Sequence, residues 1–269
     1  MSPLAFSRSG RGEPLVLLHG LGLARESWRR VIPALAERFD VLAIDLPGFG
    51  ESQPLPPSVE PSPAALARSV AGLLDELGIG SAHLAGNSLG GWVALELAAL
   101  RTTASVALLC PAGLWRRDTP RYCRASLRAS RWLAEHAPGL LCGLAGNSAG
   151  RTLVLGQTHG RPWRMTPDEA CAAIRTLGTA PGFEATLRAT ARRHYESRSL
   201  EAPVTVAFGS RDVLLLRHQS RHLERLPPGT QTGQLPGCGH IPMTDDPAAV
   251  TALIVASVAR GLPDQRRAG

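Results

Sequence analysis

The sequence predicts an α/β protein with a mostly parallel central sheet, and three observations carry this prediction. Short apolar runs alternate with amphipathic stretches, Gly-rich turns follow several of the apolar runs, and one long helical segment interrupts the alternation. Parallel strands that helices connect are buried on both faces, so their sequences are continuous apolar runs. The chain has 269 residues, of which 44% are hydrophobic, which is enough to bury a large core.

The individual elements follow from this pattern in chain order. Strands are expected at the short apolar runs Leu15 to Leu18, Val41 to Ile44, His83 to Ala85, Val106 to Leu109 and Val204 to Phe208. Amphipathic helices are expected at Trp28 to Arg38, Leu66 to Leu77 and Trp92 to Leu100. A last helix is expected to start at Asp245-Asp246-Pro247, with an Asp cap and Pro at its first position, and to run to Arg260 before a polar tail.

The alternation stops between the fourth and fifth of these strands. From about Leu114 to Arg198 the chain is helical in pattern, rich in Arg and interrupted by Gly and Pro. We therefore expect a core formed by residues 1–113 and 199–269, with residues 114–198 inserted as a helical cap.

Composition and charge exclude several classes of protein. All 29 basic residues are Arg, so chemistry that needs a Lys, such as a Schiff base, is excluded. No apolar segment has the length of a membrane span, and Met1 to Arg11 lacks the apolar region of a signal peptide. The five cysteines are scattered without C-x-x-C spacing, which predicts reduced thiols in a cytoplasmic protein rather than disulfides or a zinc site.

A Ser on a sharp turn is the first candidate for chemistry. The strand at His83 to Ala85 leads into Gly86-Asn87-Ser88-Leu89-Gly90, a G-x-S-x-G motif, and then into a helix. Small residues are needed two positions before and after the Ser, because side chains there would collide with neighbouring backbone. The helix that follows directs its N-terminal N–H groups at negative charge forming near Ser88.

A second G-x-S-x-G motif surrounds Ser148. It lies within the predicted cap, follows a helical stretch broken by Pro, and has no clear amphipathic helix after it. The strand-to-helix context therefore favours Ser88 over Ser148 as a nucleophile.

A Ser nucleophile needs a base and an orienting carboxylate. His240 lies in a Gly-rich loop before the last helix, and Asp212 follows the strand at Val204 to Phe208, so the order Ser, Asp, His results. Asp118 is the competing acid, and Asp245 and Asp246 are interpreted as helix caps.

His218 and His222 have the i, i+4 spacing of metal ligands on a helix. The surrounding Arg residues favour a solvated helix face, and we predict no metal site.

Backbone donors for an oxyanion are expected in two Gly-rich turns. His19-Gly20-Leu21-Gly22 follows the first predicted strand, so the N–H of Leu21 can pair with the N–H of Leu89, the residue after Ser88.

Together these motifs resemble those of the α/β-hydrolase superfamily over essentially the whole chain. The matching residues are His19 to Gly22, Asp45 to Ser52, Gly86 to Gly91, Asp212 and Gly239-His240. The resemblance implies the α/β-hydrolase fold, with Ser88 as nucleophile, His240 as general base and acid, Asp212 as orienting acid, and the amides of Leu21 and Leu89 as the oxyanion hole. The segment Asp45 to Ser52 has a structural role in the family, and a Ser rather than an Asp nucleophile makes the epoxide hydrolase and haloalkane dehalogenase branches poor fits.

The resulting hypothesis is a serine hydrolase of carboxylic esters or thioesters that forms an acyl-enzyme and needs no metal or organic cofactor. A perhydrolase or a C–C bond hydrolase or lyase with the same residues is an alternative, and so is a non-catalytic ligand-binding protein on the same fold. A fluorophosphonate would label the enzyme and spare a receptor.

The surplus of positive charge lies in the predicted cap. The chain carries a net charge of +7, whereas Trp115 to Arg198 alone contains fourteen Arg and six acidic residues, a net +8. Arg121, Arg124, Arg128 and Arg131 form a basic stripe at helical spacing, beside an apolar stripe of Tyr122, Ala125, Ala129 and Trp132. The stripe is either a solvated face or a surface that steers an anionic small-molecule substrate or docks an acidic acyl carrier protein. Nucleic acid is not an expected partner, because no nucleic-acid motif accompanies the charge.

Six of the twelve aromatic residues lie in the cap, either seating it on the core or lining a pocket: Trp115, Tyr122, Trp132, Trp163, Phe183 and Tyr195.

Overall fold

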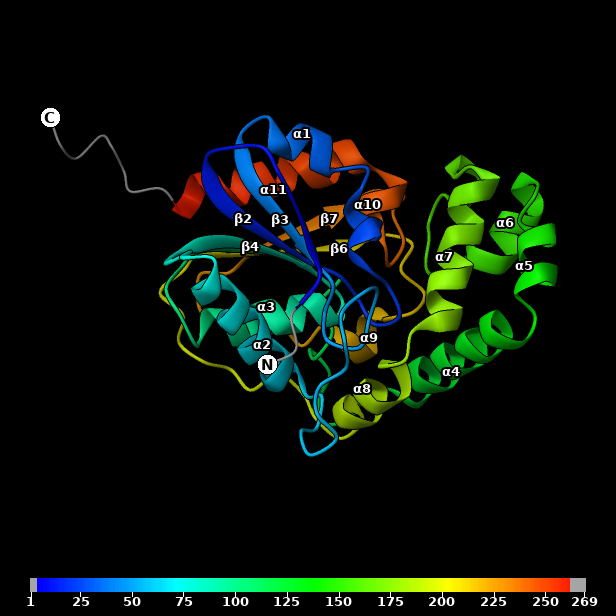
Figure 1. The fold of residues 1–269 in the computed structure, drawn as a ribbon, viewed down its shortest axis with the longest axis horizontal. Coiled ribbons are helices and arrows are strands. Elements are labelled where there is room, and N and C mark those ends of the chain that lie inside the picture. Colours follow the sequence, from blue (N-terminus) through cyan, green and yellow to red (C-terminus); the bar gives the residue numbers. More distant parts are fainter. Residues whose placement is uncertain (1–3, 262–269) are drawn as a thin grey trace, which may run out of the picture.

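Seven strands form one sheet in the order β1-β3-β2-β4-β5-β6-β7 in the computed structural model, which describes residues 4–261 (Figure 1). β1 is antiparallel to β3 and all other neighbours are parallel, which confirms the predicted mostly parallel sheet. The strands are β1 (Phe6–Ser9), β2 (Glu13–Leu18), β3 (Phe39–Ile44), β4 (Ala82–Asn87), β5 (Thr103–Leu109), β6 (Val204–Gly209) and β7 (Gln231–Leu235). All five predicted strands are present, and the two edge strands β1 and β7 are additional.

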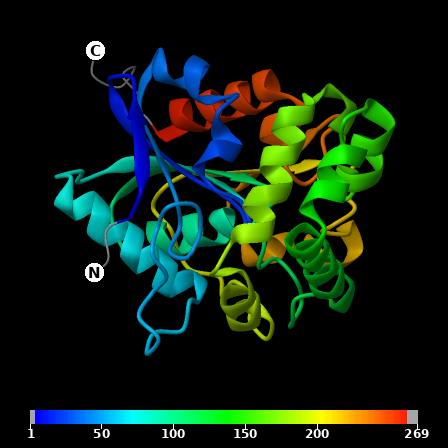
Figure 2. The same ribbon diagram turned by 45° about the vertical axis from the view of Figure 1, so that its right-hand side comes forward.

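Helices cover both faces of the sheet, as predicted (Figures 1 and 2). α1 (Ile32–Ala36) and α11 (Pro247–Gly261) lie on one face, and α2 (Pro63–Glu76) and α3 (Leu89–Ala98) lie on the other. The predicted helix at Trp28 to Arg38 is shorter than expected, because a 3₁₀ turn at Arg25–Trp28 precedes α1. Two short helices, α9 (Arg217–Ser220) and α10 (Pro242–Asp245), follow β6 and β7 in the chain. The polar tail expected after Arg260 lies mostly outside the described residues. None of the helices in residues 4–261 has the length and apolar character needed to cross a membrane.

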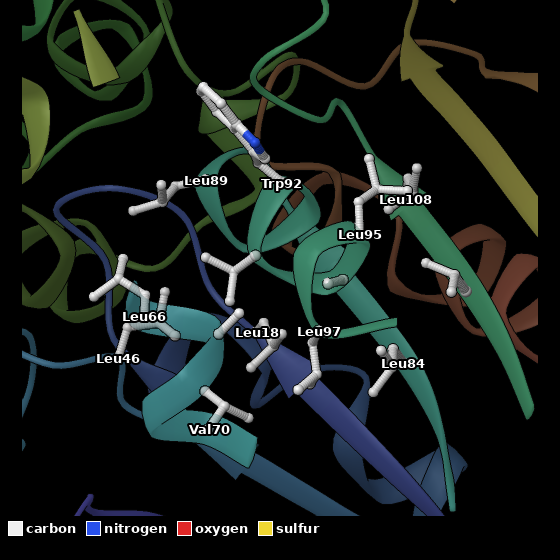
Figure 3. Packing of buried hydrophobic residues seen from close by; sticks show 14 of the residues in the cluster. Leu18, Leu46, Leu66, Val70, Leu84, Leu89, Trp92, Leu95, Leu97 and Leu108 are labelled. Atoms are coloured by element: carbon white, nitrogen blue, oxygen red, sulfur yellow. The ribbon is translucent and has the colours of Figure 1, made fainter. Parts of the chain in front are cut away.

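Two hydrophobic clusters hold the sheet between these helices. The larger contains Leu18, Leu84 and Leu108 from the strands and packs against α2 and α3 (Figure 3). The smaller contains Leu15 and Leu17 and packs against α1 and α11. Because successive strand residues point to opposite faces, the unbroken apolar run of β2 supplies both clusters.

Five helices lie between β5 and β6 and are gathered at one end of the sheet (Figures 1 and 2). They are α4 (Arg121–His136), α5 (Pro138–Leu144), α6 (Ser148–Leu155), α7 (Pro167–Thr179) and α8 (Phe183–Thr190). We refer to residues 114–198, which contain them, as the insertion. A small hydrophobic cluster of its own includes Ala134 from α4 and Ile174 from α7.

The orientation of α4 differs from the amphipathic prediction. The expected apolar stripe is exposed: Tyr122, Ala125, Ala129 and Trp132 all face solvent. Cys123 and Ala134 are buried instead. A Cβ on Gly178 of α7 would lie 2.5 Å from the Ala134 carbonyl oxygen, so α4 meets α7 at very close range, where only small residues fit. This close contact holds the face of α4 that carries Ala134 against α7.

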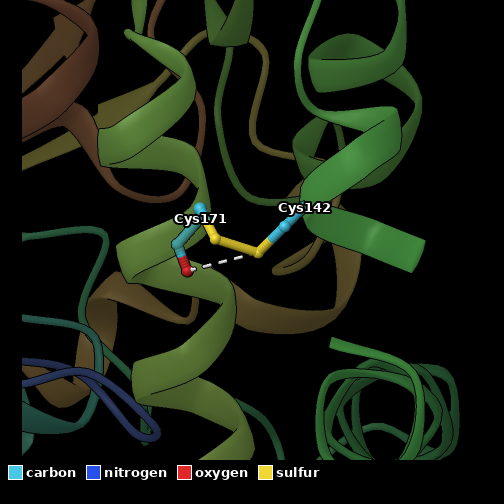
Figure 4. Close-up of a disulfide and its surroundings, with 2 residues drawn as sticks. All are labelled: Cys142 and Cys171. Atoms are coloured by element: carbon cyan, nitrogen blue, oxygen red, sulfur yellow. Dashed lines mark hydrogen bonds between the residues drawn. A yellow bond between two sulfur atoms is a disulfide. The ribbon is translucent and has the colours of Figure 1, made fainter. Parts of the chain in front are cut away.

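The prediction that all five cysteines are reduced thiols is wrong for two of them. Cys142 of α5 and Cys171 of α7 form a disulfide, with their Cα atoms 4.9 Å apart (Figure 4). The two residues are separated by 29 positions, and packing of α5 against α7 brings them together. Cys110, Cys123 and Cys238 are buried free thiols.

Candidate active site

Ser88 lies at the turn between β4 and α3 in a strained backbone conformation. Its φ is +53°, a left-handed value that non-Gly residues rarely adopt. A Cβ on Gly86 would lie 2.3 Å from the Gly90 carbonyl oxygen, and a Cβ on Gly90 would lie 2.1 Å from the Leu18 carbonyl oxygen. The two glycines are therefore required sterically, which is the reason the sequence motif suggested for them.

His240 and Asp212 are in direct contact. The His240 Nδ1–H group donates a hydrogen bond of 2.8 Å to Asp212 Oδ2. The other Asp212 oxygen accepts from the backbone N–H groups of Leu214 and Leu215, at 3.0 and 2.9 Å, and the carboxylate is fully buried. Burial opposes ionisation of this carboxyl group, but His240 and the two N–H groups outweigh burial, so the pKa of Asp212 lies below its ordinary value. Asp212 is thus an ionised hydrogen-bond partner that fixes the orientation of the imidazole.

One cavity of about 430 Å³ brings the predicted site residues together. Ser88, His240, Leu21 and Leu89 all line it. Within residues 4–261, the backbone N–H groups of Leu21 and Leu89 have no hydrogen-bond acceptor. Two unpaired donors beside a Ser on a strained turn are suited to receive an oxygen atom that acquires negative charge.

His19 has a structural role next to this cavity. Its Nδ1–H group donates to the Gly20 carbonyl oxygen at 2.8 Å, and its Nε2 accepts from the Leu46 N–H group at 3.0 Å. Burial lowers the pKa of His19, which keeps the ring neutral in this arrangement. His19 therefore ties the turn that contains Leu21 to the segment after β3.

The segment after β3 is organised around the buried carboxylate of Asp45. It accepts hydrogen bonds from the backbone N–H groups of Arg25 and Glu51, at 2.6 and 3.0 Å, and forms an ion pair with the Arg25 guanidinium. Asp45 lies outside the set of residues that line the cavity. The segment thus fixes the shape of a neighbouring loop, in agreement with the structural role that the family resemblance implies.

The competing candidates lie elsewhere. Ser148 is exposed at the start of α6 and is not part of the cavity lining, although a helix does follow it, contrary to the sequence prediction. Asp118 is exposed. The predicted helical pairing of His218 with His222 is wrong, because α9 ends at Ser220, and His222 Nδ1 instead lies 2.9 Å from a Glu224 carboxylate oxygen.

Asp245 is a functional candidate that sequence reasoning misassigned as a helix cap. Its buried carboxylate accepts from the Gly239 N–H group at 2.7 Å, beside His240, and from the N–H groups of Gly160 and Arg161 in the insertion, both at 2.8 Å. The cap of α11 is Asp246, which accepts from the Ala249 N–H group at 3.1 Å. Asp245 therefore joins the His240 loop to the insertion.

Asn87 makes a second connection that sequence reasoning missed. Its side-chain amide donates to the carbonyl oxygens of Leu109 and His240, at 3.0 and 2.9 Å. The residue before Ser88 thereby holds the His240 loop against the Ser88 turn. No local sequence signal distinguishes this role, because its partner His240 is 153 residues away.

Cys110 lies directly behind His240 and Asp212. Ligand atoms of these three residues lie within 4.8 Å of one another, a spacing that a metal ion could use. Burial, with the Asp212 charge, raises the pKa of the Cys110 thiol well above its ordinary value. Its sulfur accepts from the Gly209 N–H group and donates to the Gly239 carbonyl oxygen. Both hydrogen bonds join the thiol to backbone groups of the β6 end and the His240 loop, which supports a packing role between them.

The outer wall of the cavity comes from the insertion and is mainly apolar. Its lining includes Leu127, Leu133, Leu141, Leu144, Leu153, Leu155, Ile174, Leu177 and Leu187. Trp115 is the one aromatic residue of the six in the insertion that contributes to this lining. Phe183 and Tyr195 are buried with it in the main hydrophobic cluster, whereas Tyr122, Trp132 and Trp163 are exposed. Three of these aromatics therefore seat the insertion on the sheet, and the alternative of an aromatic-lined pocket is wrong.

His159 is a buried polar side chain in this wall. It lines the cavity with His240, and burial lowers the pKa of its imidazole. The segment that carries it is held to the His240 loop by a hydrogen bond of 2.9 Å from the Ile241 N–H group to the Thr158 carbonyl oxygen. A neutral imidazole is thus available to hydrogen-bond a polar group of a bound molecule.

Comparisons with known proteins agree with the fold. The sequence model of the α/β hydrolase fold family matches residues 13–247. An epoxide hydrolase of Mycobacterium tuberculosis is 30% identical, over 76% of this chain and 99% of its own length. A pimeloyl-[acyl-carrier protein] methyl ester esterase of Aeromonas hydrophila is 48% identical, over 35% of each chain. The solved structure of a thermophilic esterase from Thermogutta terrifontis superimposes with a TM-score of 0.76 at 27% identity, covering 96% of this chain and 93% of that one.

The chain belongs to the α/β hydrolase fold family, and it is a hydrolase. Its relatives carry the names of different reactions, so the reaction of this chain must be argued from its own site.

Proposed function

We propose that the protein is a serine hydrolase that cleaves carboxylic esters or thioesters through an acyl-enzyme. The observation that supports this most strongly is the shared cavity, in which Ser88 on its strained turn faces the same space as His240, itself oriented by Asp212 at 2.8 Å. The combination of a Ser, a His and a buried carboxylate is the arrangement that activates a hydroxyl for acyl transfer.

In the proposed reaction, Ser88 Oγ attacks the carbonyl carbon while His240 Nε2 takes its proton. Asp212 stabilises the resulting imidazolium, and the N–H groups of Leu21 and Leu89 receive the oxyanion. His240 then protonates the leaving alcohol or thiol, and a water that His240 activates hydrolyses the acyl-Ser88 bond. No metal or organic cofactor takes part in any of these steps.

The nucleophile distinguishes this proposal from the reaction named for the epoxide hydrolase relative. Attack by a carboxylate on an epoxide gives an ester, which water can hydrolyse. Attack by Ser88 would give an ether, which the site has no means of cleaving. A Ser at this position therefore favours substrates with a carbonyl group.

We further propose that residues 114–198 act as a cap over a core of residues 1–113 and 199–269. Two contacts support the cap: the Gly182 N–H group donates to the Gly48 carbonyl oxygen at 2.8 Å, and Glu169 of α7 pairs with Arg30 at 2.5 Å. The apolar cavity wall from this insertion favours an acyl chain of limited length.

The charge of the insertion supports a substrate with an anionic portion. A groove of about 440 Å³ on the outer side of α4 and α8 is lined by Arg124, Arg128, Arg188, Arg192 and Arg193, with Glu60 as the one acidic residue. A second candidate is a substrate attached to an acyl carrier protein, an acidic protein that could dock at these arginines. The partial match to a pimeloyl-[acyl-carrier protein] methyl ester esterase supports this candidate. Changing Arg124 and Arg128 to Glu should raise KM for anionic esters and leave neutral esters unchanged. Arg68→Glu, at an exposed position on α2, is the matched control.

The deciding experiment is a panel of neutral and anionic esters and thioesters. Wild type should hydrolyse members of the panel, and Ser88→Ala should lose about 10³-fold or more of kcat/KM. Ser148→Ala, which alters the same local motif, should retain full activity. Full activity of Ser88→Ala would exclude the proposal. Turnover of esters only when hydrogen peroxide is added would favour the perhydrolase alternative. Activity only on substrates with a cleavable C–C bond would favour the C–C hydrolase or lyase alternative. Wild type that binds substrates of the panel without cleaving them would favour the binding-protein alternative.

A further inference from the structure

The outward side of α4 carries apolar residues that no part of the described chain covers. Trp132 is 58% exposed, Tyr122 46% and Leu133 43%. These residues lie beside the basic stripe on the same helix. Arg121 and Arg128 of this stripe are exposed and Arg124 and Arg131 are half-buried. Glu184 pairs with Arg128 and Glu135 pairs with Arg131. An exposed apolar strip of this length is unusual on a folded surface and points to a binding function.

The neighbouring helices extend this strip. Leu140 and Leu144 of α5 are 65% and 40% exposed, and Leu153 of α6 is 78% exposed. Seven of the eleven large exposed hydrophobic residues in the described part of the chain lie in the insertion, which is about a third of the sequence. We call Trp132, Leu133, Leu140, Leu144 and Leu153 the apolar face.

The apolar face is continuous with the cavity. Leu133, Leu144 and Leu153 are exposed to solvent and also line the cavity that contains Ser88 and His240. A hydrocarbon chain held at this face could therefore enter the cavity along leucine side chains, without crossing water.

We propose that the apolar face and the adjacent arginines dock onto a lipid–water interface with anionic headgroups. Charge complementarity selects this occupant, because the insertion that carries these exposed leucines has a net charge of +8. A second copy of this chain would bring the same positive charge and be repelled. An acidic protein would pair with the arginines, but charge pairing alone would leave the exposed surfaces of Leu140 and Leu153 in water.

Vesicle binding tests this directly with the full chain. Ser88→Ala is used as the parent protein, so that binding is measured without hydrolysis and independently of the proposed catalytic role. It should sediment with vesicles of phosphatidylcholine containing phosphatidylglycerol, bind pure phosphatidylcholine vesicles at least about tenfold more weakly, and be released as salt rises from 0.1 to 1 M.

Variants separate the two halves of the surface. Leu140→Ser with Leu153→Ser should weaken binding by roughly tenfold or more for each leucine. Leu100→Ser with Leu223→Ser, exposed by 47% and 37% outside the insertion, is the matched control and should bind like the parent. Arg121→Glu with Arg128→Glu should abolish the preference for anionic vesicles. Thermal unfolding should show unchanged stability for the leucine variants and a small fall in Tm for the arginine variant, because Arg128 pairs with Glu184.

Two results would overturn the proposal. The first is absence of binding to anionic vesicles at 0.1 M salt. The second is binding that the arginine variant loses and the Leu140/Leu153 variant keeps in full, which would indicate a purely electrostatic surface suited to an acidic protein.

Discussion

Asp245 provides a quantitative test of how the site is positioned. Its carboxylate accepts three backbone N–H groups, from Gly239, Gly160 and Arg161, at 2.7 to 2.8 Å. Each hydrogen bond to a charged group contributes about 1.5–3 kcal/mol. Asp245→Asn keeps an oxygen toward Gly239 and Gly160 but turns an NH₂ group toward the Arg161 N–H group.

The loss of one such bond should lower the free energy of unfolding by about 2 kcal/mol. For a protein of this size that corresponds to a fall in Tm of roughly 4–8 °C, measurable by circular dichroism. Displacement of the His240 loop should also reduce kcat by about tenfold or more at 20 °C, where the variant is still folded. A merely structural role would lower Tm and leave kcat unchanged at that temperature.

Asp75→Asn is the matched control, because the Asp75 side chain is 73% exposed. If Asp245→Asn changed Tm and kcat no more than this control does, the reasoning about Asp245 would be refuted.

Three further predictions follow from other parts of the structure. Asp212→Asn should lower kcat/KM at pH 7 by about 10⁴-fold, because the imidazole loses its orienting charge. Since the pKa of Asp212 is lowered in the folded protein, its stabilising contribution is complete above the ordinary pKa of about 4 and is lost as pH falls further. The Tm difference between wild type and this variant should therefore close below pH 4, and a difference that grows there would contradict the assignment. Replacing Cys142 and Cys171 by Ser should lower the free energy of unfolding by about 3–4 kcal/mol, from the chain entropy of a loop of 29 residues, in a denaturant titration. Addition of a reductant should reproduce this loss in wild type and have no effect on the double variant. Gly90→Ala should prevent folding or sharply lower Tm, because its Cβ would lie 2.1 Å from the Leu18 carbonyl oxygen, whereas Gly80→Ala, with nothing within 4 Å, should be tolerated.

The centre of the sheet was predictable from the sequence, and its edges were not. The central strands are buried on both faces, so their apolar runs stand out. β1 and β7 are short edge strands with exposed polar residues, as in the sequence QTGQL of β7. Such strands are specified by their hydrogen-bonding neighbours rather than by their own composition.

The same distinction applies to the candidate site. Ser88 and Asp212 each follow a predicted strand, and His240 lies in a Gly-rich loop before the last helix, so local motifs locate all three. Asp245 and Asn87 act on backbone groups 85 and 153 positions away, which no local pattern encodes. The exposed stripe of α4 and the Cys142–Cys171 disulfide also depend on how α4 and α5 meet α7, a contact that only the folded chain reveals.

The measurement that tests the central proposal most directly is the reaction of the protein with a fluorophosphonate, followed by mass spectrometry. The Ser88 oxygen should form a bond to phosphorus as fluoride leaves, with His240 accepting the proton. We predict one adduct per chain, located on the peptide containing Ser88 and absent from Ser88→Ala. An unlabelled, folded wild-type protein, or an adduct on Ser148 in place of Ser88, would contradict the account.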